Sequence, residues 1–165
     1  MMNKRIVKVM RVETPTSQQA EKIPILLKKH FSEQLADFWE FGHETGLRPE
    51  EIRNLKFSQF IEHQLRSEPN CFFCEIESRK ARTTVCDSKK LSPVATKIIR
   101  KIRNKHPDSK FLFQSYRSRN VLNKEPKPLS RQAISRAFKE VGEMLGMKLT
   151  PMSMRQLDLK RIRVI

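Results

Sequence analysis

Acidic side chains are scarce in this sequence. Its 165 residues include 34 lysines and arginines against 18 aspartates and glutamates, which gives a net charge of +16. The excess is spread along the whole chain and is not confined to a tail. A folded domain this basic repels itself unless a polyanion is near. We therefore expect a nucleic acid partner, and favour it over an acidic membrane surface.

Long apolar runs are missing as well, so no segment is expected to span a bilayer. The stretch from Met1 to Arg11 is basic with only short apolar pieces, which does not fit a secretory signal. The three cysteines are an odd number and, without such a signal, indicate reduced thiols. These features predict a cytoplasmic protein with no membrane contact.

Metal ligands are few. Cys71 and Cys74 form a C-x-x-C pair with Cys86 nearby, and a zinc site would need a fourth ligand such as His63 or His106. Zinc motifs normally pair two such knuckles. The sequence Cys-Phe-Phe-Cys is instead typical of a buried strand, where cysteine serves as a small core residue. We expect no metal and no other cofactor.

Apolar periodicity predicts helices at both ends of the chain and strands between them. Helices are expected from Thr16, with an interruption at Pro24, and over 32–45, 49–55, 92–102 and 130–145, with a final helix near 150. The 130–145 helix carries apolar residues at helical spacing that include Ala133 and Met144. Strands are expected over 70–77 and 82–86, joined by a basic turn at 78–81, with 57–61 as a candidate third strand. This order predicts a mostly helical α+β fold, with helices around a small three-stranded antiparallel sheet.

One segment carries more specific information. Residues 45–55 read Thr-Gly-Leu-Arg-Pro-Glu-Glu-Ile-Arg-Asn-Leu. They resemble the first arginine motif of the tyrosine recombinases, the phage integrase family, whose pattern is Thr-Gly-x-Arg-x-x-Glu-x-x-x-Leu. Arg48 is the arginine of this motif, and Glu51 is expected to hold the local structure without taking part in the chemistry.

Further segments match the family in the same order. Residues 56–60 stand where the family enters its sheet, and the basic hairpin 79–82 stands where it carries a catalytic lysine. Phe-Leu-Phe at 111–113 and Pro-Leu-Ser at 128–130 match its lead into a long amphipathic helix. Residues 150–155 stand where it has His-x-x-Arg. The resemblance covers roughly residues 16 to 157.

The resemblance implies a domain that breaks DNA without metal, by attack of a tyrosine on a phosphodiester. Arg48 and Arg155 would clamp the phosphate, because each guanidinium offers paired donors to its oxygens. Lys80 would be the general acid toward the leaving 5′ oxygen, although Arg79 and Arg82 are close enough to leave that assignment open. We expect the two arginines to converge on one basic concavity with the hairpin tip at its rim. Further DNA contacts are expected from Arg79, Arg82, Lys97, Arg100, Lys101 and Arg131.

The sequence also departs from the family. Met152 stands at the usual histidine, and a thioether cannot donate a proton. The sequence ends at Ile165, before the family's tyrosine nucleophile would be reached, and the single tyrosine, Tyr116, precedes the second arginine. We therefore expect a basic N-terminal arm over 1–15 and, over 16–165, an integrase-catalytic-like domain that is incomplete at its C-terminus.

Three functions are compatible with these residues. The first is a recombinase-type protein of DNA integration on a mobile element, which binds double-stranded DNA and cannot cut it alone. Some members of the family donate the tyrosine across a subunit interface, so a homo-oligomer or an intact recombinase on DNA could complete the site. The second is a non-catalytic DNA-binding regulator that kept the fold. The third, an RNA-binding protein, lacks an aromatic-rich RNA-recognition motif.

Overall fold

Helices are the predominant regular structure in the described part of the chain. The computed structural model describes residues 14–65, 68–80, 83–116 and 125–155. The helices are α1 (Ser17–His30), α2 (Glu33–Thr45), α3 (Pro49–Arg53), α4 (Pro93–Lys105) and α5 (Arg131–Met144), with a 3-10 turn η1 (Phe57–Gln59). The strands are β1 (Phe60–Leu65), β2 (Glu68–Lys80) and β3 (Thr83–Lys90). They form one antiparallel sheet in the order β1-β2-β3, so the predicted fold class is confirmed.

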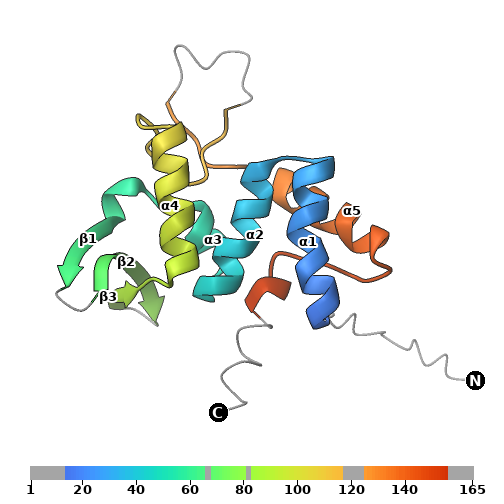
Figure 1. The fold of residues 1–165 in the computed structure, drawn as a ribbon, viewed down its shortest axis with the longest axis horizontal. Helices are drawn as coiled ribbons and strands as arrows, with labels where there is room; N and C mark the ends of the chain where they lie inside the picture. The colour runs from blue at the N-terminus through green and yellow to red at the C-terminus, as the bar shows by residue number, and fades with distance from the viewer. Residues whose placement is uncertain (1–13, 66–67, 81–82, 117–124, 156–165) are drawn as a thin grey trace, which may run out of the picture.

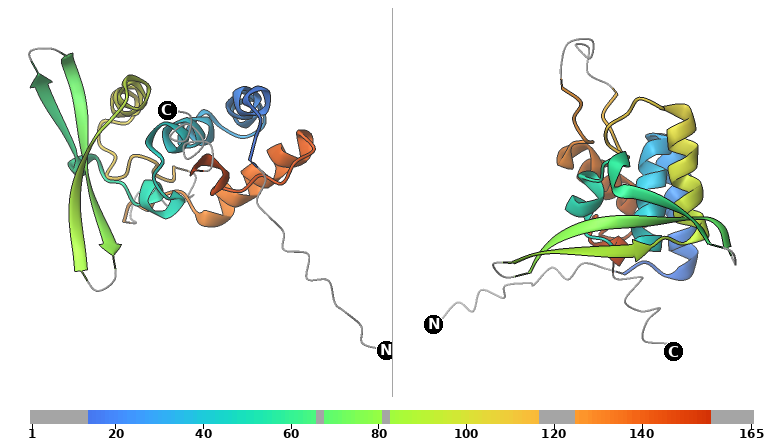
Figure 2. Two further views of the ribbon diagram at one scale, coloured as in Figure 1. Left: turned by 90° about the horizontal axis from the view of Figure 1, so that it is seen from below. Right: turned by 90° about the vertical axis from the view of Figure 1, so that its left-hand side faces the viewer.

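Helix α2 lies at the centre of the helical part. Figure 1 shows α4, α2 and α1 side by side, and Figure 2 (left) shows them end-on, with the sheet beyond α4 and α5 beyond α1. Phe38, Trp39 and Phe41 form the buried face of α2 and are all inaccessible to solvent or nearly so. Their rings meet Phe113 and Phe138 edge-to-face, with centroids 5.1 to 6.2 Å apart. This aromatic cluster joins α2 to α5 and to the loop after α4.

Helix boundaries follow local signals. Ser32, Ser92 and Ser130 each accept a hydrogen bond from a backbone N–H of the first turn of α2, α4 and α5. Gly46 ends α2 with φ of 65°, and Gly146 follows α5 with φ of 67°, a region where only glycine is unstrained. The buried face of α4 includes Ile98, Ile99 and Ile102.

Several local predictions were wrong. Pro24 does not interrupt α1, because Ile23 and Leu27 are fully buried and their packing offsets the missing hydrogen bond. Residues 57–59 form a 3-10 turn, since the Phe57 N–H donates to the Lys110 carbonyl, and the strand begins only at Phe60.

The hairpin and α5 also differ from expectation. Residues 78–80 belong to β2 and pair with 83–85, so the β2–β3 ladder reaches further than the predicted turn allowed. β-branched residues at 83–85 explain this extension, because they favour a strand. Ala133 and Met144 are exposed, because the buried face of α5 is the narrower one formed by Ile134, Ala137, Phe138 and Val141.

Two further expectations concern metals and membranes. Among the described residues, no group of three or more His, Cys, Asp or Glu side chains lies close enough to hold a metal ion. Cys74 is buried in β2, as the strand interpretation predicted, while the side chains of Cys71 and Cys86 lie outside what the structure describes. None of the helices in the described part of the chain has the length and apolar character that a membrane crossing requires.

We predict that Cys74 in the folded protein resists alkylation at about pH 8. Burial raises the pKa of its thiol to about 12, and only the thiolate reacts. Iodoacetamide labelling with peptide mass mapping measures this, and urea-unfolded protein is the control. Equal labelling rates in the folded and unfolded protein would contradict the burial of Cys74.

Candidate nucleic-acid interface

The loop between α2 and α3 presents Arg48 to solvent. Gly46 turns the chain out of α2, and the buried Leu47 fixes the loop to the core. Pro49 then opens α3, a position where its missing N–H has no partner to lose. Glu51 accepts a hydrogen bond from the Arg48 N–H at 2.9 Å, which is the structural role expected for it. The Arg48 side chain is therefore held at its base and exposed at its end.

Arg155 lies against the same loop. Its Nε donates to the Gly46 carbonyl oxygen at 3.1 Å, across 109 positions of sequence. The turn that carries it is held by a hydrogen bond from the Thr150 N–H to the Ser153 Oγ, at 3.1 Å. Met154, the residue before Arg155, is fully buried. Arg155 thus binds the loop that carries Arg48, two residues before Arg48, and their convergence on one phosphate stays a prediction.

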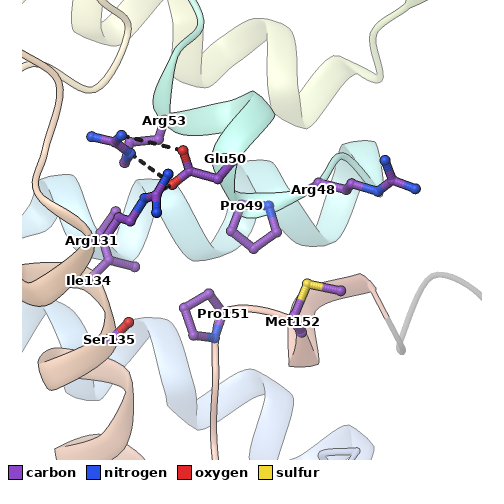
Figure 3. Close-up of a pocket in the computed structure, with 9 residues that line it drawn as sticks. All are labelled: Arg48, Pro49, Glu50, Arg53, Arg131, Ile134, Ser135, Pro151 and Met152. Atoms are coloured by element: carbon purple, nitrogen blue, oxygen red, sulfur yellow. Dashed lines mark hydrogen bonds and ion pairs between the residues drawn. The ribbon is translucent and has the colours of Figure 1, made fainter. Parts of the chain in front are cut away.

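A pocket of about 340 Å³ lies between α3, the start of α5 and the 150–155 turn (Figure 3). Met152 and Pro151 face Pro49 across it, and the Arg48 guanidinium points away from its centre. Met152 is 45% exposed, so a thioether stands at the mouth of this pocket where the family carries an imidazole. The pocket lining is Arg48, Pro49, Glu50, Arg53, Arg131, Ile134, Ser135, Pro151 and Met152.

Glu50 joins α3 to α5 at one end of this pocket. It forms ion pairs with Arg53, at 3.1 Å, and with Arg131 (Figure 3). Burial opposes ionisation of Glu50, but hydrogen bonds from Arg131 and Arg53 outweigh it, so the pKa of the carboxyl is lowered. Arg131, which we expected to contact DNA, therefore already has a carboxylate partner.

The basic residues expected on α4 differ in their surroundings. Lys97 is exposed. Arg100 pairs with Glu62 at 3.1 Å and lies over the ring of Phe72. Lys101 pairs with the buried Asp37 at 2.6 Å, which links α4 to α2. A role in DNA binding stays a prediction for all three of these basic residues.

The hairpin residues stay predictions as well. Arg79 and Lys80 lie at the end of β2, paired with Thr84 and Thr83, and their side chains are outside what the structure describes. Arg82 lies outside the described residues altogether. The end of the β2–β3 hairpin extends past the helices in Figure 2 (left).

Sequence reasoning missed Lys89. This exposed residue near the end of β3 donates from its Nζ to the carbonyl oxygen of Thr45, one residue before the carbonyl that Arg155 binds. No motif marks it, because its position depends on how the sheet packs against the end of α2. The only available signal was the pair of lysines at 89 and 90, which resembles any basic strand end.

Tyr116 lies in a different environment. Its hydroxyl hydrogen-bonds with the Ser109 hydroxyl, and its ring stacks on His106 with centroids 4.0 Å apart. It borders a separate pocket of about 270 Å³ together with Asp37 and Lys101. Burial raises the pKa of its hydroxyl, and the Ser109 hydrogen bond lowers it by less. These contacts provide no proton acceptor for a nucleophilic phenol.

Comparison with known proteins agrees with this geometry. The sequence model of the phage integrase family matches residues 14–158. The chain therefore belongs to the phage integrase family, the tyrosine recombinases. A search of curated protein sequences found no match.

Solved structures show the same fold. The XerA recombinase superposes with a TM-score of 0.64 at 18% identity, over 93% of this chain and 52% of that one. The XerH site-specific recombinase, bound to its difH substrate in a pre-cleavage complex, superposes with a TM-score of 0.62 at 14% identity. The match covers 96% of this chain and 46% of that one. The Tn1549 transposon integrase in complex with circular intermediate DNA superposes with a TM-score of 0.61 at 15% identity. The match covers 91% of this chain and 54% of that one. The chain spans about half the length of these proteins.

We predict that Gly142→Ala destabilises the protein by about 1–3 kcal/mol. A Cβ at Gly142 would lie 2.7 Å from the Met147 carbonyl oxygen and 2.8 Å from the Leu149 nitrogen. These are backbone atoms of the segment that leads to Arg155, and they cannot move aside as a side chain can. Urea unfolding followed by circular dichroism measures the loss.

Gly42→Ala is the matched control for this prediction. Its Cβ would contact the sulfur and methyl group of Met154, the end of a flexible side chain, and alanine favours a helix. We expect a smaller loss than at Gly142. Equal stability of Gly142→Ala and the unmodified protein would show that the segment with Met147 and Leu149 does not approach α5 so closely.

Proposed function

We propose that this chain binds double-stranded DNA as a recombinase-type protein of DNA integration and site-specific recombination. The observation that carries the proposal is the hydrogen bond from Arg155 to the Gly46 carbonyl, which holds a second arginine beside Arg48. A guanidinium presents several N–H donors in a fixed plane, so two of them can bind the oxygens of one phosphate. The net charge of +16 supports the same partner.

The solved relatives support DNA as the ligand. XerH was solved with its difH substrate, and the Tn1549 integrase with circular intermediate DNA. A shared fold alone does not transfer a function. The proposal therefore depends on the two arginines in this chain, with Lys80 of the β2 end as the proposed general acid. We place this activity in the cytoplasm, where DNA is accessible.

We further propose that the 165-residue polypeptide does not cut DNA by itself. Covalent catalysis needs a nucleophile in contact with the phosphate and a base to activate it. Its only tyrosine, Tyr116, is engaged with Ser109 and His106 and borders a pocket other than the one beside Arg48. A tyrosine supplied by an intact recombinase on the same DNA would complete the site.

A DNA-binding regulator without catalysis is the second candidate. Met152 favours it, because a thioether at the pocket mouth supplies neither a proton nor a strong hydrogen bond to a phosphate. Strand transfer in the presence of an intact recombinase would favour the first function. Binding without any effect on strand transfer would favour the second.

We predict that duplex DNA binding weakens steeply with salt. Each neutralised phosphate contributes about −0.9 to the slope of log affinity against log salt concentration. Arg48→Gln and Arg155→Gln should each reduce this slope by about one. Fluorescence anisotropy of a labelled duplex between about 50 and 200 mM salt measures the slopes.

Arg136→Gln is the control for these two variants. Arg136 is exposed on α5 and already pairs with Glu140, so we expect its slope to match that of the unmodified protein. Affinity that does not change with salt in the unmodified protein would refute DNA binding through phosphates. Equal slopes for all three variants would refute the assignment of the two arginines.

We also predict that the polypeptide forms no covalent bond with DNA. The test is a nicked suicide duplex, incubated with the protein and separated on a denaturing gel. We expect no shifted band, since Tyr116 lies away from the two arginines. A shifted band that disappears in Tyr116→Phe would show that Tyr116 is the nucleophile.

A further inference from the structure

Two cations from opposite sides of the domain meet on adjacent peptide groups. Lys89, near the end of β3, donates to the Thr45 carbonyl, and Arg155, from the 150–155 turn, donates to the Gly46 carbonyl. Neighbouring Cα atoms are about 3.8 Å apart, so the two carbonyls that hold these cations belong to adjacent residues. Arg48 follows two residues later on the same loop. The loop from Thr45 to Arg48 therefore binds two cations through its carbonyls and carries a third.

These three cations share one feature, which other described basic residues such as Lys29 and Lys97 also have. Within the described residues, no carboxylate lies at ion-pair distance from Arg48, Lys89 or Arg155. Carboxylate partners are found instead for Lys28, Arg53, Arg100, Lys101, Lys105, Arg131 and Arg136. Among the described residues, this group therefore has no carboxylate counter-charge, and what distinguishes it is that two of its members bind adjacent peptide groups.

Each of the three retains free hydrogen-bond donors. An ammonium has three N–H groups and a guanidinium has five. Lys89 uses one of its donors on Thr45, and Arg155 uses its Nε–H on Gly46. Those bonds orient the side chains, while the remaining donors are available to an anion. A group of fixed, unneutralised donors favours an anionic ligand.

We propose that Lys89 is a third phosphate-binding residue, which contacts the DNA backbone beside Arg48 and Arg155. The proposal rests on the proposed DNA-binding function and adds a residue that the family motifs do not mark. Lys89 acts as a compact point charge, and its bond to the Thr45 carbonyl holds it next to the arginine pair.

The register of the sheet distinguishes Lys89 from Lys80. Lys89 pairs with Cys74, whereas Lys80 pairs with Thr83 at the far end of the same ladder. Six positions of β2 separate Cys74 from Lys80, which corresponds to about 20 Å along the strand. The two lysines would therefore contact different parts of a bound duplex, and separate mutations can measure the contribution of each.

The experiment compares duplex binding of Lys89→Gln, Lys89→Arg and Lys80→Gln by anisotropy over a range of salt concentrations. Glutamine keeps a donor toward the Thr45 carbonyl but removes the charge. We expect Lys89→Gln to reduce the salt slope by about 0.9, which is a loss of about eightfold at 0.1 M if both proteins bind equally at 1 M. Lys89→Arg should retain the slope of the unmodified protein.

Lys29→Gln is the matched control. Lys29 is exposed near the end of α1, which adjoins the start of α2, so it is about one helix length from Thr45. If the unmodified protein does not bind duplex DNA, the DNA-binding proposal fails and this inference fails with it. If it binds with a steep slope and Lys89→Gln matches Lys29→Gln, only the assignment of Lys89 fails.

Lysine acetylation of the unmodified protein gives a second measurement that does not depend on how a variant folds. We expect a saturating duplex to slow acetylation of Lys89 by several-fold and to leave Lys29 unchanged, as read by peptide mass mapping. Equal acetylation of Lys89 with and without bound duplex would overturn the proposal.

Discussion

The hydrogen bond from Arg155 to the Gly46 carbonyl is the contact on which the proposed site depends. It joins the end of the described chain to the loop after α2, across 109 positions. The closing contact alone cannot offset the entropy of ordering so long a loop, so the packing on either side must do so. Buried Met154 before Arg155 and buried Leu47 after Gly46 supply that packing. The position of Arg155 beside this loop therefore depends on the packing of the core.

Helix α2 carries this arrangement because it is buried along several faces. Its aromatic residues contact α5 and the loop after α4, and its last residue, Thr45, receives the bond from Lys89. A left-handed glycine then redirects the chain so that Arg48 emerges from a rigid base. Preorganised donors of this kind bind a charge without the cost of ordering mobile side chains.

The distribution of ion pairs separates two uses of the same residue types. Lys101 is held between α4 and α2 by a buried carboxylate, and Arg53 and Arg131 share Glu50 between α3 and α5. These cations stabilise contacts between helices. Among the described residues, the side chains of Lys89 and Arg155 donate only to backbone carbonyls, and that of Arg48 is exposed to solvent. Charge alone therefore could not identify which basic residues belong to the proposed site.

The sequence by itself determined the helix starts at Ser32, Ser92 and Ser130, the left-handed end of α2 and the mostly helical fold class, because caps, periodicity and glycine act over a few residues. The arginine motifs also directed attention to Arg48 and to Arg155, which binds the loop that carries Arg48. Only the tertiary structure decided that Lys101 pairs with Asp37, that Lys89 reaches Thr45 and that α1 continues through Pro24. Each of these depends on the packing of segments far apart in the chain, and local sequence patterns carry no record of that packing.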